Sequence, residues 1–147
     1  MSDAAIADVV VRATGGFDDP DPVETSRRGL VLADDVSAGT IGLLGVGPAG
    51  SAAVVLAARS PEIPRLVLVN VPFDPDTLGV DPTDVHARVL LLFGARDPAT
   101  GSAHGRKWQR ALPSARLEMV PDGDADLVGR MWSRALSHLA PGRTRAR

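Results

Sequence analysis

Residues 41–58 read IGLLGVGPAGSAAVVLAA, and this stretch decides the fold. Its first part is a short apolar run that ends in a cluster of glycines, which is typical of a buried strand followed by a tight turn. From Pro48 to about Arg59 the residues are small and apolar all round, which predicts a buried helix with proline in its first turn. A buried strand joined to a buried helix by a glycine turn is the repeating unit of α/β folds.

The rest of the chain continues this alternation of strands and helices. Apolar runs predict further strands at residues 9–11, 66–69, 89–93 and 116–120, and apolar spacing predicts helices at 102–112 and 127–139. Residues 26–36 are only weakly helical, and residues 15–25 and 72–83 are expected to be loops. Because continuous apolar strands are covered on both faces, we expect an α/β fold with a small, mostly parallel sheet of about five strands flanked by helices. Residues 1–142 are expected to form this single domain, followed by a basic flexible tail at 143–147.

Composition limits the classes of function. The chain has 147 residues, no cysteine, 16 basic and 18 acidic residues, and 3% aromatic residues. These values exclude disulfides and zinc–cysteine sites and argue against nucleic-acid binding. No stretch is long and apolar enough to span a membrane, and the acidic N-terminus lacks the basic residues of a signal peptide, so we expect a cytoplasmic protein that does not bind membranes. The three histidines have no metal-ligand spacing, so neither a metal nor a cofactor is expected.

The glycine turn has two interpretations. Residues 45–50 match the pattern G-x-G-x-x-G between a strand and a helix, and they resemble the GxGPAG turn of FAD-binding Rossmann proteins. In such proteins the glycines allow the backbone to approach a pyrophosphate at the helix N-terminus. An acidic residue is expected about twenty residues further on, where it binds a ribose. Asn70 stands there instead, so an FAD- or NAD-binding module is kept as an alternative.

The same turn resembles the nucleophile elbow of the α/β-hydrolases. In that family a G-x-S-x-G turn joins a central strand to a helix and presents a serine at its apex. Here Gly47 occupies the apex, and Ala49 replaces the second glycine. Upstream, residues 9–11 followed by Gly15 and Gly16 are weakly similar to the strand and loop that help to build the oxyanion hole.

The resemblance continues downstream in the same order and with the same spacing, and it covers roughly residues 40–139. Residues 65–70 resemble the next strand of the family. Residues 89–98 resemble the strand and turn that carry the catalytic acid, which places Asp97 at the acid position. Residues 112–121 resemble the last strand before the catalytic histidine, and Asp124 holds the histidine position.

The resemblance implies an α/β-hydrolase fold that lacks the serine and the histidine of the catalytic triad. Glycine offers no nucleophile, and an aspartate does not shuttle protons near neutral pH unless burial raises its pKa strongly. We therefore expect a protein that binds a small organic or acyl-type ligand, with Gly47 and Pro48 at the helix N-terminus in the site. A non-hydrolytic cyclisation, epimerisation or isomerisation with Asp97 as base would be analogous to family members in secondary metabolism.

Each candidate side chain also has a purely structural interpretation. Asp97 precedes a proline and can close a turn, and Asp124 can cap the last helix. His104 can be a solvated residue of a first helical turn, and Asn70 can cap a strand instead of binding a ligand. A non-catalytic interaction protein is therefore a further alternative. Because a truncated sheet leaves edge strands that need covering, we also expect a homodimer.

Overall fold

One parallel sheet organises the molecule. In the computed structural model, which describes residues 8–13, 18–97 and 100–142, six strands lie in the order β2-β1-β3-β4-β5-β6. Every neighbouring pair is parallel. The strands are β1 (Asp8–Arg12), β2 (Leu30–Ala33), β3 (Thr40–Val46), β4 (Arg65–Val69), β5 (Arg88–Gly94) and β6 (Ala115–Val120). The predicted parallel α/β architecture is confirmed, with one strand more than the five expected.

The additional strand is β2. The prediction of a weak helix at residues 26–36 is wrong, because β2 lies within this range. Residues 30–33 pair with β1 in parallel register, with Leu30 opposite Asp8. The helix in this region, α1 (Pro22–Arg27), lies earlier, mostly inside the segment expected to be a loop. Asp21 begins α1 because its side chain accepts a hydrogen bond from the Glu24 backbone N–H. Pairing with β1 thus overrides the local helical preference of residues 30–33.

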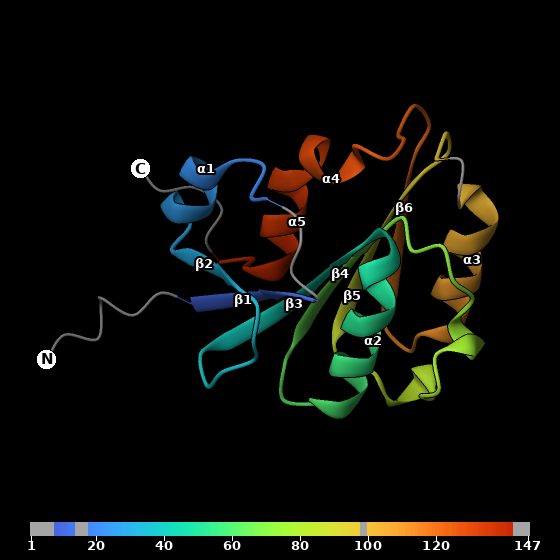
Figure 1. Cartoon of the computed structure of the whole chain (residues 1–147), viewed down its shortest axis with the longest axis horizontal. Helices are drawn as coiled ribbons and strands as arrows, with labels where there is room; N and C mark the ends of the chain where they lie inside the picture. Colours follow the sequence, from blue (N-terminus) through green and yellow to red (C-terminus); the bar gives the residue numbers. More distant parts are fainter. Residues whose placement is uncertain (1–7, 14–17, 98–99, 143–147) are drawn as a thin grey trace, which may run out of the picture.

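Helices cover both faces of the sheet (Figure 1). They are α2 (Gly50–Arg59), α3 (Gly101–Ala111), α4 (Leu127–Arg130) and α5 (Trp132–Leu139), together with the short 3₁₀ turns η2 (Gly47–Ala49), η3 (Pro75–Thr77) and η4 (Pro82–Asp84). Helices α2 and α3 lie on one face, and α1, α4 and α5 lie on the other. The continuous helix expected at 127–139 is instead broken at Met131, whose backbone (φ −106°, ψ 19°) departs from helical geometry.

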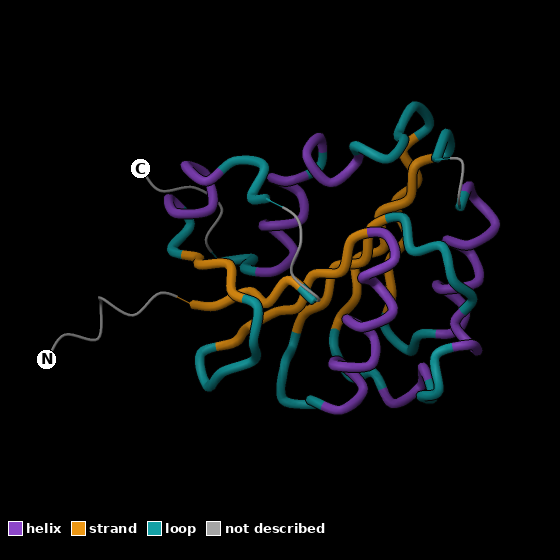
Figure 2. The backbone as a smooth tube through the Cα atoms, in the orientation of Figure 1, coloured by secondary structure: helices purple, strands orange, loops and turns teal. Residues whose placement is uncertain are grey.

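Two apolar cores result from this layering, one on each face of the sheet. Trp108 and Phe93 are fully buried in the core under α2 and α3, and Trp132 and Leu136 are buried in the core under α5. Successive residues of the central strands alternate between the two cores, as a sheet covered on both faces requires. Figure 2 shows the strands running between the two helical layers.

The direction of strand addition reverses between β1 and β3. The chain first adds β2 on one side of β1, then returns through residues 34–39 and adds β3 to β6 on the other side. Such a reversal leaves a crevice at the carboxyl ends of the two strands, which is where open α/β sheets bind their ligands. The glycine turn after β3 lies at this position.

Candidate functional site

The glycine turn after β3 has the backbone shape of an elbow. Gly47 is at its apex, with a positive φ of 60°. Among the residues that the structure describes, none has an atom within 4 Å of a Cβ placed on Gly47. Residues with a side chain adopt this left-handed conformation at a cost of roughly 1–2 kcal/mol, which glycine avoids. The turn therefore keeps the geometry that would present a side chain, but carries none.

The other two glycines of the pattern allow close packing. A Cβ atom on Gly45 would lie 2.7 Å from the Cβ of Ala53 and 2.7 Å from the Cα of Gly50. A Cβ atom on Gly50 would collide with the side chain of Val71. These contacts bring α2 down onto β3 and onto the segment after β4. The G-x-G-x-x-G pattern is thus explained by one backbone conformation and by two close approaches.

Pro48 follows the apex and is exposed at the carboxyl edge of the sheet. In α/β-hydrolases the residue after the nucleophile donates its backbone N–H to the oxyanion hole. Proline has no N–H and offers no such hydrogen bond. The site therefore lacks a usual oxyanion donor, in addition to the hydroxyl that is absent at Gly47. Gly15 and Gly16, the other candidates near the oxyanion position, lie outside the described residues.

Asp97 lies in the turn after β5 and is half-buried. Its backbone N–H donates to the Gly94 carbonyl oxygen over 3.1 Å, and its Oδ2 accepts from the Thr100 hydroxyl over 2.9 Å. The side chain thus bonds within its own turn, to a hydroxyl rather than to the backbone amides of the structural interpretation. The carboxylate is at the carboxyl end of the sheet, as the resemblance to the acid position implies.

Asp124 lies in the exposed turn after β6. Its Oδ1 accepts from the Asp126 backbone N–H over 3.0 Å, and its carbonyl oxygen accepts from the Leu127 N–H over 3.2 Å. The side chain thus organises the entry to α4, close to the capping role considered for it.

Asn70 ties together the three turns at this edge of the sheet. It is 6% exposed and has a positive φ of 50°, a conformation that asparagine tolerates better than most residues. Its Nδ2 donates to the Asp124 carbonyl oxygen over 2.9 Å, and its Oδ1 accepts from the Gly94 N–H over 2.8 Å. The amide therefore joins the end of β4 to the turns that hold Asp97 and Asp124. Of its two expected roles, these contacts are those of the cap.

His104 lies in the first turns of α3 and faces a different group of residues. Its Nδ1 is 3.0 Å from the Thr100 carbonyl oxygen, to which it donates in the matching tautomer. Its Nε2 is 3.6 Å from the Asp74 Oδ1, and the Lys107 Nζ is 3.3 Å from the same oxygen. Thr100 thus stands between the two candidates: its hydroxyl contacts Asp97 and its carbonyl contacts His104.

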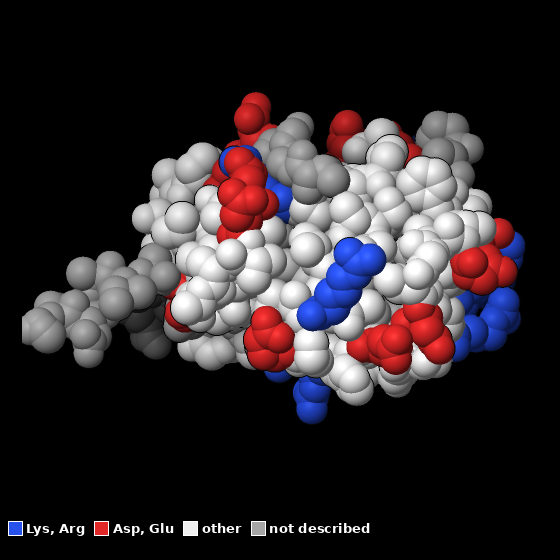
Figure 3. Space-filling model, turned by 60° about the horizontal axis from the view of Figure 1, so that its bottom comes forward, with Lys and Arg blue, Asp and Glu red and all other residues white. Residues whose placement is uncertain are grey.

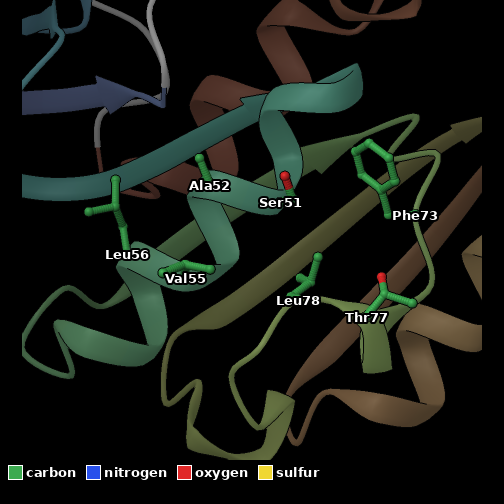
Figure 4. Close-up of a pocket in the computed structure, with 7 residues that line it drawn as sticks. All are labelled: Ser51, Ala52, Val55, Leu56, Phe73, Thr77 and Leu78. Atoms are coloured by element: carbon green, nitrogen blue, oxygen red, sulfur yellow. The ribbon is translucent and has the colours of Figure 1, made fainter.

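An apolar groove begins one helical turn beyond the apex. It has a volume of about 650 Å³ and lies between α2 and residues 73–78. Its lining carries no charge and consists of Ser51, Ala52, Val55, Leu56, Phe73, Thr77 and Leu78 (Figure 4). The two hydroxyls are already engaged, since Ser51 donates to the Pro48 carbonyl over 3.0 Å and Thr77 donates to the Asp74 carbonyl over 2.7 Å.

Sequence reasoning missed this groove because one wall comes from a segment expected to be only a loop. Phe73 is 41% exposed, which is unusual for a large aromatic side chain. Its carbonyl oxygen accepts a hydrogen bond from the Trp108 indole N–H over 2.9 Å, which anchors the wall to α3. The sequence offered one signal for this groove, a single phenylalanine in an otherwise polar loop. The fold brings this loop beside the largely apolar helix α2.

The described ranges contain no group of three or more acidic or histidine side chains arranged to hold a metal ion. Within the same ranges, no helix has the length and apolar character needed to cross a bilayer.

Comparisons with known proteins agree on the fold. The structure is similar to an α/β-hydrolase enzyme from the metagenome of Mar Chica lagoon sediments (TM-score 0.70, 14% identity, covering 93% of this chain and 92% of that one). It is also similar to an esterase of Pyrococcus furiosus (TM-score 0.69, 11% identity, 95% and 82% covered) and to a carboxylesterase of Bacillus subtilis (TM-score 0.63, 15% identity, 94% and 85% covered). No protein-family model and no curated protein sequence matches the chain. These similarities establish the α/β-hydrolase fold, as the sequence resemblance implied.

Proposed function

Because the chain has the α/β-hydrolase fold but glycine at the apex of the elbow, we propose that it is a non-hydrolytic protein that binds a small acyl-type or organic ligand. The observation that carries this proposal is the conformation of Gly47: an elbow with positive φ and no side chain, where a Cβ would have no atom of the described residues within 4 Å. The missing N–H of Pro48 and the exposed aspartate at the histidine position support it, since acyl transfer needs a nucleophile, a base and an oxyanion hole.

The groove beside α2 supports an apolar ligand. Its volume of about 650 Å³ is within the usual size range of small-molecule sites. Its hydroxyl groups are bound to backbone carbonyls, so recognition along its length is by apolar contact. We propose that the apolar body of the ligand lies along Val55 and Leu78, and that its polar end lies at the turn of Gly47.

A variant in which a bulky side chain fills the groove separates binding at this site from non-specific binding. Decanoic acid and methyl decanoate serve as probes, and thermal unfolding measures the stabilisation. Ala52→Trp places a large side chain in the groove, and Ala103→Trp, at an exposed position of α3 outside the groove lining, is the matched control. A ligand at a hundred times its Kd stabilises the folded state by about 2.7 kcal/mol, and this stabilisation should disappear in Ala52→Trp only. Equal stabilisation of both variants by decanoic acid contradicts the assignment.

Hydrolysis is tested directly with p-nitrophenyl esters. Neither the natural protein nor Gly47→Ser is expected to turn over these esters, because a serine without a base stays protonated. Enzyme-like turnover by the natural protein would contradict the proposal. Stabilisation by FAD or NAD, with loss of the effect when Gly47 is changed, would favour the dinucleotide-binding alternative.

An acid–base step is a second candidate, favoured by the position of Asp97. It lies after β5 at the carboxyl edge, where the sequence resemblance implies the acid position, and it is half-buried. If the bound ligand has an acidic C–H, the carboxylate is the base for an epimerisation or isomerisation. The test is exchange of ligand protons with deuterium oxide, measured by NMR, in the natural protein and in Asp97→Asn. Exchange should fall at least about a hundredfold in the variant.

We also propose that the chain forms a homodimer through the free edge of β2. The described residues contain four exposed large apolar side chains, and three of them are in or next to β2: Val23 in α1, Val31 in β2 and Val36 in the following loop. The other edge strand, β6, carries Arg116 and Glu118, and charged side chains of this kind discourage edge pairing.

A further inference from the structure

Two arginines begin neighbouring strands and lie side by side. Arg65 starts β4, Arg88 starts β5, and the two are register partners in the sheet. Their side chains point to the same face, because Val67 and Leu90, two residues further along each strand, both belong to the core under α5. Neighbouring strands are only about 4.8 Å apart, so two positive charges are held close together at the amino ends of the strands.

Three further cationic or titratable side chains surround this pair. Arg116 of β6 and Arg134 and His138 of α5 line the same hollow, which has a volume of about 400 Å³. Arg116 is 76% exposed and Arg134 is 33% exposed. The hollow thus collects four arginines in a protein whose net charge is −2. Figure 3 shows that acidic and basic side chains both occur among uncharged ones on the surface that its view brings forward.

Glu118 is paired with two of these four guanidinium groups, those of Arg134 and Arg116. Glu118 accepts from the Arg134 Nε over 3.0 Å and from its Nη2 over 2.6 Å, and it lies 3.4 Å from the Arg116 Nε. In the part of the chain that the structure describes, neither Arg65 nor Arg88 makes an ion pair. The described residues therefore leave the positive charges of Arg65 and Arg88 without a paired carboxylate, while Glu118 is shared by Arg116 and Arg134.

The surroundings of His138 affect its hydrogen bonding and its pKa. Its Nε2 is 2.9 Å from the Arg88 carbonyl oxygen, to which it donates in the matching tautomer. Burial lowers the pKa of His138, and the nearby charges of Arg65 and Arg134 lower it further. The imidazole therefore adds a polar wall to the hollow at neutral pH rather than a further positive charge.

Like charges directly opposite each other in a sheet destabilise it unless a counter-charge is present. We propose that Arg65, Arg88, Arg116 and Arg134 bind a phosphate-bearing small molecule at the amino ends of the strands, at the opposite edge of the sheet from Gly47. The arginines come from two adjacent strands, an edge strand and a helix, and a phosphate offers more oxygens to several guanidinium groups than a single carboxylate does. The guanidinium fork matches two phosphate oxygens at once. The site is separate from the groove beside α2, and neither proposal depends on the other.

Calorimetric titration with sodium pyrophosphate tests the site, with citrate and sodium chloride at matched ionic strength as the comparison anions. We expect saturable binding of pyrophosphate, at least about tenfold weaker binding of citrate, and about tenfold weaker binding of pyrophosphate to Arg88→Gln. Arg65→Gln is the second variant at the site. Arg59→Gln, at the exposed end of α2, is the matched control and should bind like the natural protein.

A second readout distinguishes a binding site from a structural role. Without pyrophosphate and at low salt, Arg88→Gln should unfold at a higher temperature than the natural protein, because one of two opposed charges is gone. With pyrophosphate the order should reverse. Equal pyrophosphate binding by Arg88→Gln and Arg59→Gln overturns the proposal, as does an equal effect of pyrophosphate and citrate. Binding of a duplex DNA oligonucleotide that pyrophosphate does not displace would identify a nucleic-acid surface instead.

Discussion

Replacing Gly47 with alanine separates the backbone conformation of the elbow from its packing. The new Cβ meets no atom of residues 8–13, 18–97 or 100–142 within 4 Å, so no steric penalty is expected. The backbone penalty remains, because φ is 60° and an L-residue pays roughly 1–2 kcal/mol there. Alanine also loses less chain entropy on folding than glycine, which returns about 0.4–1 kcal/mol. The net loss of unfolding free energy should be about 1 kcal/mol, or about 2–4 °C in Tm for a chain of this size.

Gly50→Ala is the comparison variant, because it adds a methyl group at a packed glycine instead of an open one. Its Cβ collides with Val71 across a close helix–strand contact, so overpacking should cost about 1–3 kcal/mol and lower Tm more than Gly47→Ala does. Urea unfolding followed by circular dichroism measures both variants. A loss above about 3 kcal/mol for Gly47→Ala would mean that the apex is packed rather than open. A gain in stability would mean that φ is not positive at the apex. Either result removes the basis for placing an empty elbow at this turn.

Three further changes test the rest of the molecule. Asn70→Ala removes both amide contacts and leaves the buried Gly94 N–H without its acceptor, so we expect a loss of about 2–4 kcal/mol in urea unfolding and faster hydrogen exchange at Gly94. Val31→Lys places a charge on the free edge of β2 and should convert the proposed dimer to a monomer in light scattering, whereas a dimer in both proteins would refute the β2 interface. Because burial lowers the pKa of His138 below 6.5, the unfolded chain binds its proton more readily. The contribution of His138 to stability is therefore fully present above pH 6.5 and is lost as the pH falls through its folded pKa; His138→Gln should flatten this dependence in unfolding curves between pH 7.5 and 5.

Long apolar runs made most of the sheet predictable. The central strands β3, β4 and β5 are covered on both faces, so their sequences are apolar after the first residue of each, and their order along the chain implied parallel pairing. The four-residue strand β2 has no such signal. Its extended conformation depends on pairing with β1, and the chain before it is fixed by Arg28, which bonds to Ser133 and Ser137 more than a hundred residues away. No local pattern contains that information.

The candidate site was predictable where the family resemblance fixed it and not where it depends on tertiary contacts. The elbow at Gly47 and the carboxylate of Asp97 are at the carboxyl edge of the sheet, as the order of strands implied. The role of Asn70 depends on partners 24 and 54 residues away, which only the sheet register brings together. The arginine hollow has the same origin, because Arg65 and Arg88 become neighbours only when β4 pairs with β5.

The placement of the two tryptophans gives the protein a pair of internal fluorescent reporters. The chain has two tryptophans and no tyrosine, so its ultraviolet emission comes from Trp108 and Trp132. They lie in different cores on opposite faces of the sheet, so Trp108→Phe and Trp132→Phe variants would each report on one layer alone. Trp108 is also bonded through its indole N–H to Phe73 at the wall of the groove, and its emission spectrum should shift when a ligand enters there while that of Trp132 stays constant.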